Sequence, residues 1–313
     1  MTALFNSLRW WKTSLFILLV IACVMCYFPY SRVNKDEANT LHVTCELSTK
    51  LPVSITVDPP FNESRNTAPV IAIGSAITSR KLHNVSETNL GIKFQFFYAF
   101  LPSFCNTASP YFIYKIYLAF DENDTVFTNH LLYDAFKRHF YLTTTAGSCG
   151  DRHITVILSL VKCDYTGKPA WAQNDAMIEA YIDHSDYFYR INDDTKLLTR
   201  GWTEKFILQL ENYDPPRVGV VGPQVIGNRF RILTYEFVHR THIDIFGFYY
   251  PHEFTDWYAD KWMTFVYKPR RSTELFDVRL IHTRMLGRRY DAHSNMKILL
   301  GHHVAKNTAI INR

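Results

Sequence analysis

Three consecutive oxygen-bearing side chains, Asn192, Asp193 and Asp194, end the aromatic and apolar run "YFYRI" at 187–191. Adjacent carboxylates and an amide oxygen are ligands that Mg²⁺ and Mn²⁺ prefer in proteins. The same residue types also cap helices and build turns. The triplet therefore indicates either a site for a hard divalent cation or an ordinary turn, and the elements around it must decide between the two.

A second acidic group, at 121–124, follows the apolar run "YFIYKIYLAF" at 111–120. Both acidic groups belong to a regular alternation of expected strands and helices. Strands are expected at 69–77, 111–120, 153–161, 186–191 and 217–224, and helices at 131–140, 171–182 and 201–212. This order predicts an α/β fold with a mainly parallel sheet and helices on both faces. Ligands bind at the carboxyl ends of such strands, so both acidic groups are expected to face one crevice.

The segment "GKPAWAQNDAMIEAYIDHSDYFYRINDDTKLLTRGW" at 167–202 resembles the central block of glycosyltransferases with the GT-A (Rossmann-like) fold, especially the family 2 group. In that family a Gly-Lys loop leads into a helix with an Asn and small residues, then a turn and a strand that ends in a DxD motif. Lys168, Asn174, Ala180, Asp186 and the triplet at 192–194 fill these places in order. The resemblance covers about 69–300 and is specific over about 100–265.

The resemblance implies a transferase that uses a nucleotide sugar as donor and Mn²⁺ or Mg²⁺ as cofactor. By the family's pattern, Asp193 and Asp194 hold the metal on the donor diphosphate. Asn192 departs from the pattern, because the family has Asp there, and one negative charge is missing. Its amide oxygen can still coordinate the metal or bond the ribose, so Asn192 is also expected to bind the nucleotide sugar. His282 is a third possible metal ligand, although a single His in "RLIHTRML" is also typical of a packed core.

Further donor contacts follow from the same resemblance. Lys168 and Asn174 are expected to bind the nucleotide sugar, and Asp121 and Asp124 lie where the family's second strand meets the base or ribose. Three arginines near the C-terminus are candidates to neutralise the departing nucleoside diphosphate: Arg284, Arg288 and Arg289. Arg288 and Arg289 could instead belong to a solvated turn.

The segment 233–262 is dense in His and aromatic residues, a mixture that suits the binding of a glycan acceptor but also an ordinary core. Four of its residues are predicted to contact the acceptor: His239, His242, Tyr249 and Trp257.

A catalytic base for the acceptor hydroxyl is expected in the same segment. Asp256 is the first choice and Asp260 the second, spaced i,i+4 on one face of a short helix. Asp256 could instead cap that helix. A retaining mechanism would need no such base, and the sequence leaves the stereochemistry open.

The N-terminal part has a different character. Residues 13–31 carry no charge, and a helix of that length would reach roughly 28 Å, enough for a thin bilayer. A cleaved signal peptide is the alternative. The predicted organisation is a cytoplasmic tail at 1–12, a signal-anchor helix at 13–31, a stem at 32–68 and a lumenal GT-A domain at 69–313. This organisation predicts a single-pass type II protein of the Golgi or endoplasmic reticulum membrane.

Composition fits that location without proving it. The net charge of +5 is not gathered in blocks, which argues against nucleic acid as a partner. Four cysteines follow the apolar segment, at positions 45, 105, 149 and 163, and could form two disulfides in any of three pairings. Sequons for N-glycosylation begin at Asn62, Asn84 and Asn123.

The sequence thus favours a membrane-anchored, metal-dependent glycosyltransferase with a glycan, protein or lipid acceptor. A non-catalytic, lumenal sugar-binding relative of the same fold remains the main alternative, with Asn192 in its favour. A glycosidase would use two opposed carboxylates and neither nucleotide nor metal. A purely structural membrane glycoprotein would tolerate loss of Asp194.

Overall fold

The computed structural model describes residues 68–228, 232–283, 287, 289–290 and 297–311. Contacts divide the chain into two units, 1–42 and 43–313, and all described residues belong to the second. The predicted tail, anchor helix and stem (except residue 68) lie outside the described residues. Within the described ranges, no helix has the length and apolar character to cross a membrane.

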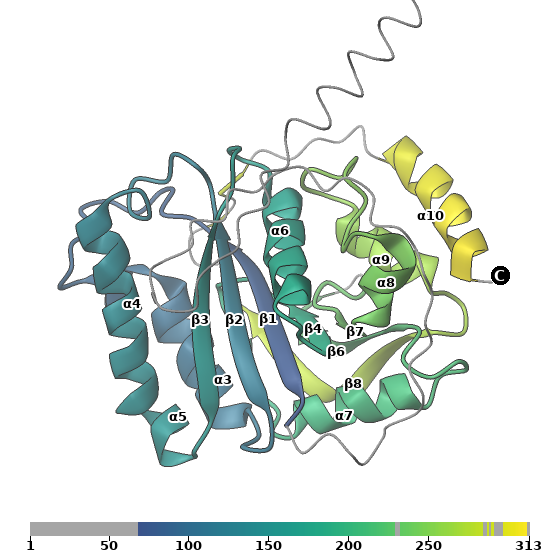
Figure 1. Ribbon diagram of the computed structural model, residues 1–313, viewed down its shortest axis with the longest axis horizontal. Coiled ribbons are helices and arrows are strands. Elements are labelled where there is room, and N and C mark those ends of the chain that lie inside the picture. Colours follow the sequence, from purple (N-terminus) through teal and green to yellow (C-terminus); the bar gives the residue numbers. More distant parts are fainter. Residues whose placement is uncertain (1–67, 229–231, 284–286, 288, 291–296, 312–313) are drawn as a thin grey trace, which may run out of the picture. The chain divides into compact units, whose positions relative to one another are not determined.

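The described residues form one eight-stranded sheet with the order β3-β2-β1-β4-β7-β6-β8-β5 (Figure 1). Its strands are β1 (Val70–Ile77), β2 (Ile113–Phe120), β3 (Thr155–Lys162), β4 (Tyr187–Arg190), β5 (Thr195–Leu197), β6 (Val220–Ile226), β7 (Phe237–His239) and β8 (Ser272–His282).

The sheet is mixed, and only part of it matches the expected mainly parallel arrangement. β1 runs parallel to β2 and to β4, and β2 runs parallel to β3. β6 runs parallel to β8. β7 is antiparallel to both β4 and β6, and β5 is antiparallel to β8. The connection from β6 to β7 is shorter than the dozen or more residues that a parallel crossover needs, so these neighbours run antiparallel.

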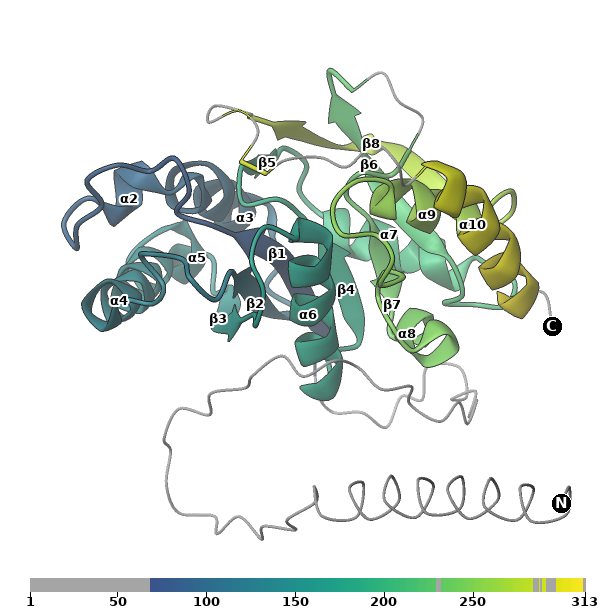
Figure 2. The ribbon, with the colours of Figure 1, turned by 90° about the horizontal axis from the view of Figure 1, so that it is seen from above.

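Helices cover both faces of the sheet, which confirms the predicted α/β architecture (Figures 1 and 2). One face carries α2 (Leu90–Lys93), the π-helical turn η1 (Phe96–Phe100), α3 (Leu101–Thr107), α4 (His130–Thr145), α5 (Ser148–Asp151) and α7 (Trp202–Glu211). The other carries α6 (Pro169–Ile182), α8 (Thr241–Phe246), α9 (Ala259–Val266) and α10 (Lys297–Ile311).

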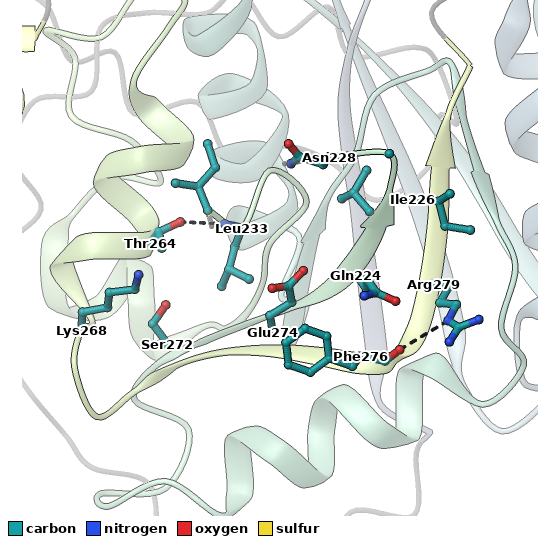
Figure 3. Close-up of a pocket in the computed structure, with 13 residues that line it drawn as sticks. Gln224, Ile226, Asn228, Leu233, Thr264, Lys268, Ser272, Glu274, Phe276 and Arg279 are labelled. Carbon is teal, nitrogen blue, oxygen red and sulfur yellow. Dashed lines mark hydrogen bonds between the residues drawn. The ribbon is translucent and has the colours of Figure 1, made fainter. Parts of the chain in front are cut away.

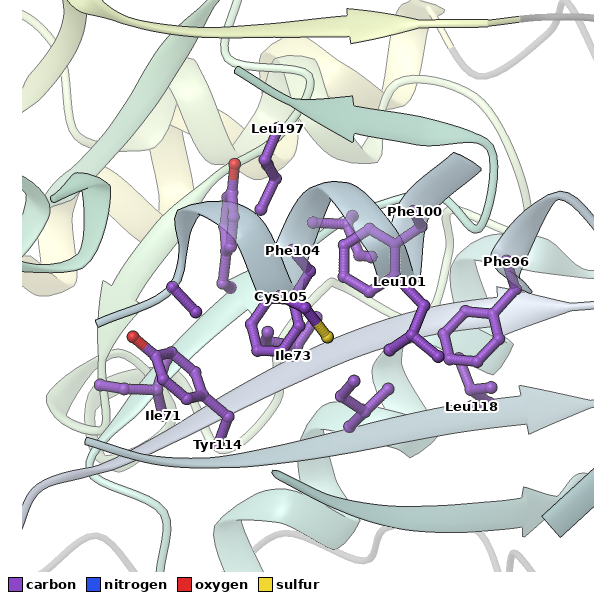
Figure 4. Packing of buried hydrophobic residues seen from close by; sticks show 14 of the residues in the cluster. Ile71, Ile73, Phe96, Phe100, Leu101, Phe104, Cys105, Tyr114, Leu118 and Leu197 are labelled. Atoms are coloured by element: carbon purple, nitrogen blue, oxygen red, sulfur yellow. The ribbon is translucent and has the colours of Figure 1, made fainter. Parts of the chain in front are cut away.

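Aromatic rings fill the first face, where α3 lies over β1 and β2 (Figure 4). Phe96, Phe100 and Phe104 follow one another on η1 and α3 and stack in series, with ring centroids 5.7 Å apart at each step. Rings of this size bury large apolar areas and so dominate the stability of this layer.

Small residues set the second face. Buried alanines of α6 face the sheet, and at Gly74 of β1 an added Cβ would lie 2.7 Å from the Met177 side chain. The resulting close contact holds α6 near β1.

A disulfide joins Cys105 of α3 to Cys149 of α5. Cys163 carries a buried thiol, and Cys45 lies outside the described residues. The pairing of Cys105 with Cys149 was one of the possibilities that the sequence left open.

The strand order reverses direction at β1. The chain moves outward from β1 to β2 and β3, and then returns to place β4 on the other side of β1. Such a switch point opens a crevice at the carboxyl ends of the two strands that flank it. In this chain, the loops after β1 and β4 begin there.

Candidate functional site

The first feature of the crevice is the pair formed by Asp193 and Arg289. The guanidinium of Arg289 contacts both carboxylate oxygens of Asp193, one of them at 2.7 Å. Both side chains are nearly buried, at 2% and 12% exposure. Burial disfavours the charge of Arg289, yet Asp193 keeps the pKa of Arg289 above its ordinary value. Asp193 is therefore committed to an arginine, an arrangement that the sequence did not indicate.

Asp194 has a different partner. Its Oδ1 lies 3.0 Å from Nε2 of His282, the last residue of β8. Burial alone would raise the pKa of Asp194, but the hydrogen bond and charge of His282 outweigh it and the pKa is lowered. The backbone supports the contact, because Thr283 donates through both N and Oγ1 to the carbonyl of Asp194.

The predicted metal site can be tested against this geometry. Two neighbouring ligands of an octahedral ion, each about 2.1 Å from it, are about 3 Å apart. The Asp194–His282 pair meets that requirement, and hard cations commonly take their other ligands from water and phosphate. Asp193 does not fit, because Arg289 holds both of its oxygens. In the described part of the chain, no three His, Cys, Asp or Glu side chains are grouped to hold one ion.

The opposite wall of the crevice comes from the loops after β1 and β2. Arg80 pairs with Asp121 at 3.3 Å, and its guanidinium lies 5.7 Å from the centre of the Tyr290 ring. The backbone N–H of Gly167 donates to Asp121 at 3.1 Å. Burial raises the pKa of Asp121, while Gly167 and Arg80 oppose the rise. Because Tyr290 follows Arg289, these contacts connect Asp121 to Asp193 across the crevice.

A third wall is η1. Tyr98 is 37% exposed, and its pKa is raised by burial and by the charges of Asp193 and Asp194. Gln95 donates to Thr283 at 3.0 Å, which ties this turn to the end of β8. π-helical turns are rare and occur frequently at functional sites. Tyr98 thus offers a surface ring beside the two acids.

Two predicted donor contacts have structural roles instead. Asp124 is buried and accepts hydrogen bonds from Ser79 N, Ser79 Oγ and Thr78 Oγ1, so it anchors the loop after β1. Asn174 of α6 accepts from the backbone N–H groups of Tyr249 and Tyr250 at 2.9 and 3.0 Å. Since the carboxylate of Asp124 and the amide oxygen of Asn174 are occupied by the protein, neither prediction is supported.

Of the remaining residues predicted to bind the donor, two lie in the described part of the chain and two lie outside it. Lys168 precedes α6 and places its ammonium 3.6 Å from the centre of the Trp171 ring. Asn192 donates to the Tyr235 hydroxyl at 3.4 Å. Arg284 and Arg288 lie outside the described residues.

Three predicted acceptor contacts are wrong for this conformation, because their side chains are buried. His239 is 8%, His242 1% and Tyr249 0% exposed. Burial lowers the pKa of His239 to about 3 and that of His242 to about 4, so both rings are neutral near pH 7.

The bonds of His242 show its structural role. Nε2 donates to the carbonyl of Tyr249 and Nδ1 accepts from the Tyr267 hydroxyl, both at 2.8 Å. The ring is therefore a satisfied core histidine. Of the four predicted acceptor residues only Trp257 is at the surface, with 50% exposure.

The two candidate bases are not on one helix. α9 begins at Ala259, so Asp256 lies in the preceding turn, where it contacts Trp257 N and accepts from Thr255 Oγ1 at 3.3 Å. Asp260 is in the first turn of α9 and partly buried. Burial raises the pKa of Asp260, and the charge of Arg190 opposes the rise.

A further acid, Glu236, lies directly across from Arg190 on the sheet, and the sequence did not single it out. Its carbonyl accepts from Arg190 N at 2.9 Å, and its carboxylate accepts from the Tyr250 hydroxyl. It is 0% exposed, and burial raises its pKa to about 8 despite the charge of Arg190. The charge of Asp260 also raises the pKa of Glu236.

Sequence reasoning missed several residues that line the crevice. The same carboxyl-end rule that identified Asp121 would have identified Arg80, which follows the first strand. Tyr98 and Tyr290 do not directly follow any of the strands expected from the sequence, and only the fold brings them to the crevice.

Comparisons with known proteins add little to this geometry. No family model matches the chain, and no curated protein matches it. Among solved structures, the chain is similar to S. aureus TarS at 13% identity and a TM-score of 0.42, over 69% of this chain and 37% of TarS. It is similar to the apo-form glycosyltransferase GlyE of Streptococcus pneumoniae TIGR4 at 12% identity and a TM-score of 0.39, over 79% and 63%. The chain thus covers less than two thirds of either protein, and TM-scores this low establish neither its family nor its activity.

Proposed function

We propose that this chain is a GT-A-type glycosyltransferase, which moves a sugar from a nucleotide-sugar donor to a hydroxyl group of a glycan, protein or lipid. The observation that carries the proposal is the convergence of Asp194, His282 and Arg289 at the switch point of the sheet. A pair suited to a divalent cation and a fixed arginine there match the needs of a diphosphate leaving group.

Arg289 would neutralise the diphosphate. A guanidinium has five N–H donors, so one that pairs with Asp193 through two of them can still donate to a phosphate oxygen. The fork to Asp193 fixes its orientation, which is the preorganisation that stabilises developing charge. This role replaces the one predicted for Asp193 as a metal ligand.

Asp194 and His282 would hold Mn²⁺ or Mg²⁺. When bound, such an ion supplies positive charge to the oxygens of the departing diphosphate. The carboxylate and imidazole would exchange their mutual hydrogen bond for the ion. The sheet keeps their separation nearly fixed, because Thr195 pairs with His282 in the register of β5 and β8.

Asp121, Arg80 and the Tyr290 ring would hold the nucleoside. Their wall combines a carboxylate, a guanidinium and an aromatic face, which suits the hydroxyls of a ribose and the face of a base. Asp260 is the better candidate for the base, because its raised pKa brings proton affinity closer to neutral pH.

Two observations support a secretory location. The Cys105–Cys149 disulfide is typical of proteins that mature in an oxidising compartment. Asn84 and Asn123 are exposed, as glycosylation requires. We propose a type II orientation in the Golgi or endoplasmic reticulum membrane, with residues 69–313 in the lumen.

The test is a thermal-shift screen of the full-length chain in detergent. Uridine and guanosine diphosphates and their sugars are added with and without Mn²⁺, and release of nucleoside diphosphate is followed in parallel. We expect one nucleotide to raise Tm in a metal-dependent manner, and Asp194→Ala and His282→Ala to abolish the metal effect. Glu204→Gln is the matched control, because Glu204 is an exposed acid in α7 outside the crevice.

The outcomes separate the alternatives. Stabilisation by a nucleotide without any release of nucleoside diphosphate would identify the non-catalytic relative. A folded chain that responds to none of these nucleotides would contradict the donor site altogether.

A further inference from the structure

A cavity of about 820 Å³ lies between β6, β8 and α9 (Figure 3). This volume is in the range of sites for small organic ligands. None of the sequence-based site predictions falls on it.

The lining combines planar polar side chains with an exposed ring. Gln224 and Glu274 are half-buried and Ser272 lies beside them, whereas Phe276 is 65% exposed. Leu233 closes the inner wall as a buried apolar residue. Amide, hydroxyl and carboxylate groups next to an aromatic face are the combination that binds a sugar ring, with its hydroxyl edge and its apolar C–H face.

The charged residues of the lining restrict the class of ligand that the cavity can bind. Lys268 and Arg279 are cationic and Glu274 is anionic, so the described lining carries a net charge of +1, and its two cations come from separate segments. Arg279 is partly engaged, because its Nε donates to the carbonyl of Phe276 at 3.5 Å. A neutral, polyhydroxylated ligand fits this lining better than a strongly anionic one.

The cavity is connected to the candidate reaction centre along two elements. In the sheet, Gln224 of β6 is paired with Arg279 of β8, and three residues further along β8, roughly 10 Å, is His282. On α9, the cavity residue Thr264 donates to the carbonyl of Asp260 at 2.8 Å and accepts from Leu233 N at 2.9 Å (Figure 3). The cavity is therefore linked through β8 to the metal pair and through α9 to the candidate base.

A third connection runs through Tyr235, two residues after Leu233. The Tyr235 hydroxyl accepts from Asn192, and its ring centre lies 6.1 Å from that of His282. Tyr235 thus links the segment that forms the Leu233 wall to the triplet at 192–194. Of the predicted acceptor residues, His239, His242 and Tyr249 lie in the core and Trp257 is exposed, so most of an acceptor site would have to come from another surface.

We propose that this cavity binds the acceptor as a neutral saccharide chain, with Phe276 against one sugar face and Gln224 and Glu274 on its hydroxyls. This inference rests on the proposed transferase function, and it names the acceptor class for that site.

The test measures saccharide binding directly. Methyl glycosides of glucose, galactose, mannose and N-acetylglucosamine, and their disaccharides, are added to the full-length chain and followed by saturation-transfer NMR. We expect at least one saccharide to bind, Phe276→Ala and Glu274→Gln to weaken its binding by roughly tenfold, and Phe276→Trp to retain it. Tyr111→Ala is the control, because Tyr111 is a 74% exposed ring outside the cavity.

Two results would overturn the proposal: no saccharide bound by the wild type, or equal binding by Phe276→Ala and Tyr111→Ala. The nucleotide thermal shift is measured on the same variants, so the donor site and the cavity are tested independently. If a nucleotide stabilises the protein but saccharide binding is unchanged in Phe276→Ala, the transferase proposal stands and the proposal for the cavity is wrong. Saccharide binding through Phe276 without any nucleotide response leaves the cavity as the site of a non-catalytic sugar-binding protein.

Discussion

At the residue scale, Asp193 and Asp194 are adjacent in the chain, but the fold directs them to different partners. The fork from Arg289 takes up the oxygens of Asp193, whereas Asp194 faces the imidazole of His282. The distinction could not be read from the sequence, because it depends on which side of the crevice each carboxylate faces. The proposed site therefore has two sources of positive charge: the fixed guanidinium of Arg289 and an exchangeable divalent ion at Asp194 and His282.

The Asp193–Arg289 pair makes the first prediction. Arg289→Ala leaves a buried carboxylate without its partner, which typically costs about 3–5 kcal/mol. Asp193→Asn removes the charge that Arg289 compensates, so the double variant should be more stable than the sum of the two single losses implies. Urea unfolding in a double-mutant cycle should give a coupling energy of about 1–3 kcal/mol. Additive losses would show that the pair does not form in solution.

Glu236 makes a prediction about pH. Its pKa rises from 4.5 to about 8 on folding, because burial disfavours the charge. Between these values the folded state binds more protons than the unfolded state, so the free energy of unfolding falls as pH rises from about 4.5 to 8. Glu236→Gln stays neutral and keeps an oxygen for the Tyr250 hydroxyl, so it should lose this dependence and gain a few kcal/mol over wild type at pH 8.

The measurement is the denaturant midpoint of both proteins at pH 5, 6, 7 and 8. Glu204→Gln, an exposed acid, should follow the wild type throughout. Parallel curves for Glu236→Gln and wild type would mean that Glu236 is ionised in the folded protein across this range.

At the element scale, long elements with clear apolar runs were predictable. The runs at 69–77, 111–120 and 153–161 became β1, β2 and β3, and the helical patterns at 131–140 and 171–182 became parts of α4 and α6. The strands β5 and β7 are three residues long, and so short a run carries no periodicity. Their pairing is what makes the sheet mixed.

The rule about carboxyl ends found the crevice but not the role of each residue in it. It placed Asp121 and the triplet at 192–194 correctly at one edge of the sheet. It could not show that Asp124 and Asn174 are used by the backbone of segments 45 to 76 positions away in the chain. Nor could composition distinguish an aromatic acceptor surface from an aromatic core, and the structure gives His239 and His242 to the core.

β6 provides the element-scale prediction. The strand expected at 217–224 extends to Ile226, so Gly222 and Pro223 lie in its interior, with an irregular register between Pro223 and Gln224 that accommodates the missing N–H. A Cβ at Gly222 would lie 2.7 Å from the carbonyl oxygen of Tyr235. Gly222→Ala must therefore displace Tyr235, which contacts Asn192 and His282.

We expect Gly222→Ala to lower Tm and also to weaken the nucleotide-dependent thermal shift. Gly301→Ala is the matched control, because no atom within 4 Å would meet its Cβ and α10 should gain up to about 1 kcal/mol from the better helix former. If Gly222→Ala keeps the full nucleotide-dependent thermal shift, the position of Tyr235 does not affect donor binding and the prediction is wrong.

At the scale of the whole molecule, the proposed donor site takes Asp121 and Asp194 from the loops after β2 and β4, and the proposed acceptor cavity lies along β6 and β8. β8 takes part in both sites, since Arg279 lines the cavity and His282 faces Asp194. One strand thus sets the distance between the two proposed substrates. The whole arrangement depends on a sheet whose two halves unfold together.

The Cys105–Cys149 disulfide tests that cooperativity. It closes a loop of sequence separation 44 that contains β2 and α4, and β2 lies between β1 and β3 in the sheet. The chain-entropy relation gives about 4 kcal/mol for a loop of this length. Because β2 cannot leave the sheet without opening both neighbours, the loss should shift the single global transition instead of creating a second one.

The variant Cys105→Ala/Cys149→Ala should therefore show one urea transition at a lower midpoint, with an m-value that reports any change in the compactness of the unfolded state. A thiol reductant should move the wild type to the same midpoint and leave the double variant unchanged, which controls for effects of reductant on the buried Cys163 thiol. Two separate transitions in the variant would mean that α4 and β2 form an independent unit held by the disulfide. In that case the Asp121 wall of the crevice would lose its place while the Asp194–His282 pair remained folded.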